Sequence, residues 1–174
     1  MESISFKNIR DGETFTVAGY EFIKFPAVDG KVPAVARDLL YTSRFGDNND
    51  LTQSKVLADL QREFLPKIVE AVGRENLCTI HTDLTALDGL NPYPVLESLV
   101  SLPTFDFCRA NVEIFDNYPV DDWWWTATPN SAKPHDNPHW IVCVAPSGNI
   151  SFGRYFRGGG VRPFLLFESS IFDA

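Results

Sequence analysis

The sequence predicts an α+β fold, because strand-like patterns at both ends of the chain flank two helix-like patterns in the middle. Residues 13–25 and 140–167 carry apolar runs separated by turn residues. Residues 54–72 and 104–115 place apolar side chains at helical spacing. The chain has 174 residues and no internal repeat or change of composition. We therefore expect a single domain over residues 1–174.

The N-terminal strands are predicted to form a meander. Apolar residues alternate on both sides of Ala18-Gly19, which supplies a tight turn between two short strands. Asp29-Gly30 marks a further turn, and residues 35–41 supply a third strand.

The first helix is predicted to follow the polar loop that ends at Asp50. Asp50 and Gln53 have the spacing of a capping box, in which each side chain satisfies an unpaired amide. Pro66 is expected to kink or divide this helix, because proline has no backbone N–H, and Gly73 is expected to end it.

The second helix is predicted to begin after Thr104, a residue type that caps helix N-termini well. Its expected buried stripe is Phe105, Cys108, Val112 and Phe115. Between the two helices we expect a short strand at residues 77–80 and an extended loop over residues 82–94.

The last third of the chain is predicted to return to strands. Residues 140–145 are apolar on both faces, which is typical of a central strand, and a second strand is expected over residues 150–156. Residues 157–160 read as a flexible loop before a closing strand at residues 161–167, in which Pro163 must lie at an edge or bulge.

Composition narrows the classes of partner. The formal net charge of −8 argues against affinity for nucleic acids or anionic membranes, which bind basic surfaces, and it is compatible with a protein partner that is itself basic. No apolar run has the length of a membrane span, no signal peptide is visible, and the three cysteines are widely spaced. We expect a cytoplasmic protein without a cofactor.

Metal binding and catalysis are not predicted. His135, Asp136 and His139 are residue types that bind metals, but Pro138 opposes the helical geometry that would bring both histidines to one ion. The oxygen-rich residues 47–50 fit no defined calcium loop. No G-x-S-x-G pattern is present, and the glycine-rich segment 157–160 lacks the following helix that a phosphate site needs.

The predicted binding residues are aromatic or basic, the types that dominate binding hot spots. Side chains alternate faces on a strand, so at least one of the three adjacent tryptophans at 123–125 is core and at least one faces elsewhere. The alternative, that these aromatic residues are all core, remains open. The predicted set is Trp124, Trp125, His139, Arg154, Tyr155 and Arg157.

The chain resembles a family of uncharacterised bacterial and phage domains with a tryptophan-rich "WWLRSP"-type motif and a terminal "GVRP" motif. The matching residues are 123–129, Ser147-Gly148 and 160–163, although Thr126 and Ala127 depart from the family pattern. The layout is also similar to C-type-lectin-like domains, including relatives of formylglycine-generating enzymes and of phage receptor-binding proteins. The catalytic cysteines of the former have no counterpart here.

This resemblance implies two main helices around a small, twisted, mostly antiparallel sheet. It also implies that Trp123, Arg162 and Pro163 are scaffold, whereas the loops at residues 126–139 and 153–160 carry binding.

Three functions from different classes follow. The first is a non-enzymatic protein- or ligand-binding module encoded by a phage or mobile element. The second is an acidic phage inhibitor of a host defence nuclease, similar to anti-CRISPR proteins, that covers a basic nucleic-acid-binding surface. The third is a small hydrolase-type enzyme. The second function predicts that acidic side chains gather on one face, namely Asp47, Asp50, Asp59, Glu63 and Glu70.

Overall fold

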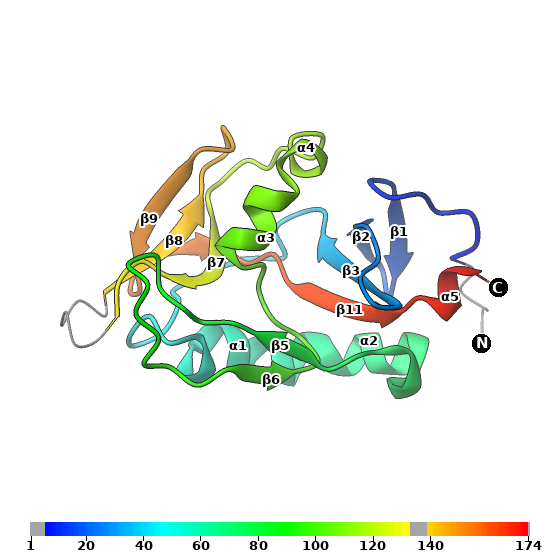
Figure 1. The fold of residues 1–174 in the computed structure, drawn as a ribbon, viewed down its shortest axis with the longest axis horizontal. Helices are drawn as coiled ribbons and strands as arrows, with labels where there is room; N and C mark the ends of the chain where they lie inside the picture. Colours follow the sequence, from blue (N-terminus) through cyan, green and yellow to red (C-terminus); the bar gives the residue numbers. More distant parts are fainter. Residues whose placement is uncertain (1–5, 133–138, 174) are drawn as a thin grey trace.

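A computed structural model describes residues 6–132 and 139–173, and these residues form an α+β fold (Figure 1). They build three sheets, not the single small sheet that the resemblance implies. The strands are β1 (Thr14–Val17), β2 (Tyr20–Lys24), β3 (Lys31–Ala36), β4 (Thr42–Ser43), β5 (Ile80–Thr82), β6 (Leu96–Ser98), β7 (Trp124–Pro129), β8 (Trp140–Val144), β9 (Ile150–Arg154), β10 (Gly159–Gly160) and β11 (Phe164–Glu168). The helical segments are η1 (Leu51–Gln53), α1 (Lys55–Asp59), η2 (Leu60–Phe64), α2 (Leu65–Val72), η3 (Arg74–Asn76), α3 (Phe105–Ala110), α4 (Val112–Phe115) and α5 (Ser170–Asp173).

The first sheet is antiparallel, with the strand order β1-β2-β3-β11. The predicted hairpin at its start is confirmed: Ala18 and Gly19 both have positive φ, 53° and 81°, as a two-residue turn with primed geometry requires. The third strand begins at Lys31, directly after the Asp29-Gly30 turn, and ends at Ala36, earlier than the predicted span of residues 35–41.

The second sheet has the order β4-β10-β7-β8-β9, so β9 is an edge strand. The predicted strands at residues 140–145 and 150–156 are β8 and β9, which pair antiparallel from Val144 opposite Ile150 to Trp140 opposite Arg154. Two expectations about loops were wrong. All six residues of β7 are buried, so the proposed binding loop at residues 126–139 begins inside a strand. Gly159 and Gly160 form β10 between β4 and β7 and are not a flexible loop.

The first predicted helix is a helical segment over residues 55–72 without a gap. The division expected at Pro66 is a change of helix type along this segment. The π-helical turn η2 stands immediately before α2, where the Leu65 N–H donates to the Leu60 carbonyl, five residues back. Pro66 then lies in the first turn of α2, where no amide donor is needed. Asp50 caps the short η1 turn, and the cap of α1 is Ser54, whose Oγ accepts the Leu57 N–H.

The second predicted helix is interrupted at Asn111, whose φ of −122° separates α3 from α4. Thr104 caps α3 as predicted, since its Oγ1 accepts the Phe107 N–H at 3.1 Å. The predicted buried stripe is wrong for Val112, which is 48% exposed, because the break at Asn111 changes the helical phase. Of the four stripe residues only Cys108 is fully buried.

Figure 1 shows how these elements are arranged in the molecule. The helical segment of residues 55–72 runs along the lower side of the view, and the short sheet of β5 and β6 lies beside it. Strands β8 and β9 lie at the opposite end from β1, with α3 and α4 above and between the larger sheets. No helix in the described part of the chain is long and apolar enough to cross a membrane.

Candidate functional site

The three adjacent tryptophans divide between the two faces of the second sheet. Trp125 has no exposed surface, packs against Phe45 with ring centroids 5.4 Å apart, and donates its Nε1–H to the Ser43 carbonyl at 2.9 Å. Trp123 packs edge-on against Trp125 with ring centroids 4.8 Å apart. Trp124 points to the other face, where it is 2% exposed and helps to line a pocket. The prediction that Trp125 binds a partner is therefore wrong, because a partner cannot reach its side chain. Trp125 supports the sheet instead.

The other four predicted residues lie together at the end of β9. His139 and Tyr155 stack with ring centroids 5.6 Å apart, and the Tyr155 N–H donates to the His139 carbonyl at 3.0 Å. The Arg154 guanidinium lies over the rings of Trp140 at 4.8 Å and Phe156 at 5.9 Å. Arg157 follows in the turn, where its N–H donates to the Arg154 carbonyl. The structure places these four residues next to one another, with Trp140 and Phe156 beside them.

A buried amide holds the two described segments on either side of residues 133–138. Asn49 has no exposed surface, and its Nδ2 donates to the carbonyls of Ser131 at 2.7 Å and Trp140 at 3.1 Å. Its Oδ1 accepts the Tyr93 hydroxyl at 2.5 Å. The start of β8, which carries the stacked His139, is thereby attached to two distant segments of the chain.

Arg154 and Arg157 differ from the other arginines in their partners. Among the described residues, neither has a carboxylate or carbonyl partner for its side chain. In contrast, the side chains of Arg10, Arg37, Arg44, Arg62 and Arg109 each pair with a carboxylate, whereas those of Arg74 and Arg162 donate to carbonyls. The end of β9 therefore carries two positive charges that no carboxylate of residues 6–132 or 139–173 neutralises.

The backbone of β9 is half unpaired. The Ala145 N–H donates to the Asn149 carbonyl and the Tyr155 N–H to the His139 carbonyl, so the odd-numbered residues of β9 face β8. The backbone N–H and C=O groups of Ile150 and Phe152 consequently point away from β8, at the edge of the sheet. Within the described residues, no group forms a hydrogen bond with them. Their side chains are 43% and 46% exposed. An exposed, apolar edge strand of this kind is a template for pairing with another chain.

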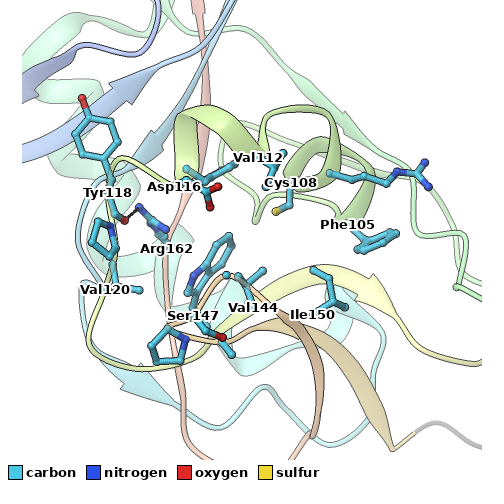
Figure 2. Close-up of a pocket in the computed structure, with 17 residues that line it drawn as sticks. Phe105, Cys108, Val112, Asp116, Tyr118, Val120, Val144, Ser147, Ile150 and Arg162 are labelled. Atoms are coloured by element: carbon cyan, nitrogen blue, oxygen red, sulfur yellow. Dashed lines mark hydrogen bonds between the residues drawn. The ribbon is translucent and has the colours of Figure 1, made fainter.

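A separate pocket of about 600 Å³ opens between α3–α4 and the β8–β9 hairpin (Figure 2). Phe105 and Val112 line one wall, and Val144 and Ile150 line the other. Arg162 lies at one end beside Tyr118 and Val120. Sequence reasoning missed this pocket because its walls come from distant segments; the one local signal is Asn111, a poor helix former in the middle of the predicted helix.

Arg162 is held rigidly at the end of this pocket. It is 2% exposed, its Nε donates to the Ala36 carbonyl at 2.8 Å, and its Nη2 donates to the carbonyls of Arg37 at 2.8 Å and Tyr118 at 3.4 Å. The rings of Phe115 and Trp124 lie beside its guanidinium, with their centroids 5.3 and 5.0 Å from Cζ. Burial lowers the pKa of Arg162 to about 10, so the group stays charged at neutral pH.

The described histidines lie in different parts of the fold, and the described thiols are buried. His81 lies on the small sheet 3.4 Å from Glu97, far in sequence from His139, and neither residue lines a pocket with the other. Burial raises the pKa of Cys78 to about 11 and that of Cys108 to about 12, so these thiols stay protonated at neutral pH. Within residues 6–132 and 139–173, no three His, Cys, Asp or Glu side chains could share a metal ion. His135 and Asp136, considered above as metal ligands, lie outside the described residues.

The acidic residues expected to form one face are mostly paired within the chain. Asp59 contacts Lys55 and also Arg62, at 2.6 Å, and these cations lower the pKa of its carboxyl. Asp50 is buried and caps η1. Asp47 pairs with Arg44 at 2.8 Å, and Glu63 lies 3.3 Å from Arg62.

No family model, curated protein or solved structure matches the chain. Geometry is therefore the basis for the functional proposal.

Proposed function

We propose that this protein is a non-enzymatic protein-binding module that adds an extended, acidic segment of a partner protein to the free edge of β9. The observation that carries the proposal is the outward-facing backbone of Ile150 and Phe152, beside two arginines that have no carboxylate partner in the described part of the chain. Backbone bonds to an added strand supply affinity, and the exposed side chains supply specificity. Arg154 and Arg157 select an acidic segment, since each forms a charge-assisted bond to a carboxylate.

The proposal includes a C-type-lectin-like relationship, a phage or mobile element as the source and the host cytoplasm as the location. The burial of Arg162 and the packing of Trp123 against Trp125 support the relationship, because the resemblance gives Trp123 and Arg162 a scaffold role. Arg154, Tyr155 and Arg157 lie within the second expected binding segment, residues 153–160.

The charge at β9 favours an acidic partner segment over the basic surface that net charge alone suggested. The inhibitor hypothesis is less well supported, because four of its five carboxylates are already paired or act as helix caps. Glu70 is the member of that set which remains exposed without an assigned cation. The hydrolase hypothesis gains no support from the buried, protonated thiols.

Selection from a random library of short displayed peptides tests the proposal without knowledge of the natural partner. We expect enriched peptides to alternate apolar residues and to carry an acidic residue at one end. Phe152→Pro should abolish their binding, because proline removes an outward N–H that β8 does not use. Phe152→Ala is the matched control: it removes the ring but keeps the N–H, so a weaker loss is expected.

Charge reversal tests the arginine contribution. Arg157→Glu should weaken binding of the enriched peptides at least about tenfold, since it replaces attraction by repulsion. Lys7→Glu is the control, because Lys7 is exposed in the segment before β1, at the opposite end of the molecule (Figure 1). Enriched peptides that bind Phe152→Pro and Arg157→Glu as tightly as the native chain would overturn the proposal, and so would a selection without enrichment.

A further inference from the structure

We propose that the pocket between α3–α4 and the β8–β9 hairpin binds a small-molecule carboxylate with an apolar body, and that Arg162 binds the carboxylate. This site differs from the peptide-binding edge in the groups that it uses, although both include the side chain of Ile150. The pocket uses the side chains between the helices and the sheet, whereas the edge uses the outward backbone of β9 and the arginines at its end.

The first observation is a buried positive charge without a counter-ion. Arg162 is 2% exposed, and among the described residues it forms no ion pair with a carboxylate. Asp38 favours the charged guanidinium only from beyond ion-pair distance. A charge removed from water is costly unless a partner compensates it, and the carbonyl acceptors supply partial charges only.

The second observation is the one guanidinium nitrogen that remains available. Nε and Nη2 donate to three backbone carbonyls, and the rings of Phe115 and Trp124 lie beside the guanidinium. Nη1 has no acceptor within the described part of the chain. Since Arg162 lines the pocket, Nη1 is the donor that a ligand can use. One free nitrogen matches a singly charged carboxylate, whereas a phosphate would need more donors and more positive charge.

The third observation is the apolar space beside this charge. Phe105, Val112, Val144 and Ile150 line the walls, and the volume of about 600 Å³ lies in the range of small-molecule sites. Two charged residues also contribute to the lining. Arg109 is paired with Asp106 at 2.9 Å, and Asp116 is exposed. Arg162 is therefore the lining charge that is both removed from water and without an ion pair. A ligand with a carboxylate and an apolar body matches Arg162 and the apolar walls.

Octanoate and 1-octanol are suitable probes, because they have the same chain length and differ in charge. We expect octanoate to bind to the native chain at least about tenfold tighter than 1-octanol, measured by calorimetry or by the fluorescence change of the tryptophans. Arg162→Gln should remove this preference by weakening octanoate alone. Because Arg162 also ties three carbonyls, circular dichroism must show that this variant is folded.

Val112→Glu is a second variant that does not depend on Arg162. It puts a negative charge in the apolar wall of the pocket, at a position that is 48% exposed, and should weaken octanoate binding at least about tenfold. Val28→Glu is its matched control, since Val28 is 62% exposed and lies outside the pocket. The proposal is overturned if octanoate does not bind, if octanol binds equally well, or if Val112→Glu binds octanoate like the native chain. None of these results bears on peptide binding at β9.

Discussion

Gly159 lies where a side chain has no room. A Cβ atom added there would be 2.6 Å from Trp123 Cζ3 and 2.6 Å from Trp125 Cε2. Both rings belong to the packed support of the second sheet, so they cannot move away cheaply. We expect Gly159→Ala to lower the free energy of unfolding by roughly 1–3 kcal/mol, the usual cost of overpacking.

Gly158 is the matched control for this prediction, because a Cβ added at Gly158 meets no atom within 4 Å. Gly158→Ala should change the free energy of unfolding by less than about 0.5 kcal/mol. Urea unfolding of both variants measures the difference. Equal stability of the two would show that the tryptophan rings at Gly159 can rearrange.

The same residue explains why a sequence pattern was misread. Three consecutive glycines are typical of a flexible loop, since glycine adds backbone freedom. In this chain Gly159 and Gly160 instead permit close approach of the tryptophans and of Leu39. The distinction depends on residues more than 30 positions away, so local composition could not have shown it.

At the scale of elements, α3 forms one wall of the pocket and depends on its N-terminal cap. Thr104 accepts the Phe107 N–H at 3.1 Å. Thr104→Ala should destabilise the protein by about 1 kcal/mol, because an amide of the first turn loses its acceptor. Thr104→Ser keeps the hydroxyl and should retain most of the stability. Thermal or urea unfolding compares the two, and a Ser variant as unstable as the Ala variant would mean that the methyl group, not the cap, matters.

Elements with local signals were predicted well, and elements defined by distant partners were not. The β1–β2 hairpin follows from its own turn residues, and β8 follows from its apolar run. In contrast, β4 and β10 are two residues each and exist because they pair with one another and with β7. The predicted patch at Arg154 and Tyr155 depended only on neighbours in sequence, whereas the pocket depends on α3–α4 packing opposite the β8–β9 hairpin. This non-local assembly explains why the sequence led to a prediction of the patch and not of the pocket.

At the scale of the whole molecule, buried thiols link stability to alkaline pH. Burial raises the pKa of Cys108 from 9.0 to about 12 and also raises that of Cys143. The unfolded chain then loses these protons at lower pH than the folded chain does. The stabilisation that comes from keeping these thiols protonated in the folded chain is fully present below pH 9. It is lost as the pH rises, and the free energy of unfolding then falls with a slope approaching about 1.4 kcal/mol per pH unit for each thiol.

Urea unfolding under reducing conditions between about pH 8 and pH 10 measures this slope. Deprotonation of Arg162 in the folded state would raise the free energy of unfolding as the pH rises, which is opposite to the effect of the thiols. The chosen pH range lies mostly below the pKa of Arg162, about 10. A variant with both Cys108→Ala and Cys143→Ala lacks the two titrating groups. It should be less stable at pH 8, because both side chains are buried, yet its stability should fall less steeply as the pH rises. An equally steep fall in this variant would assign the alkaline sensitivity to other groups, of which Cys78, with its pKa raised to about 11, is the next to test.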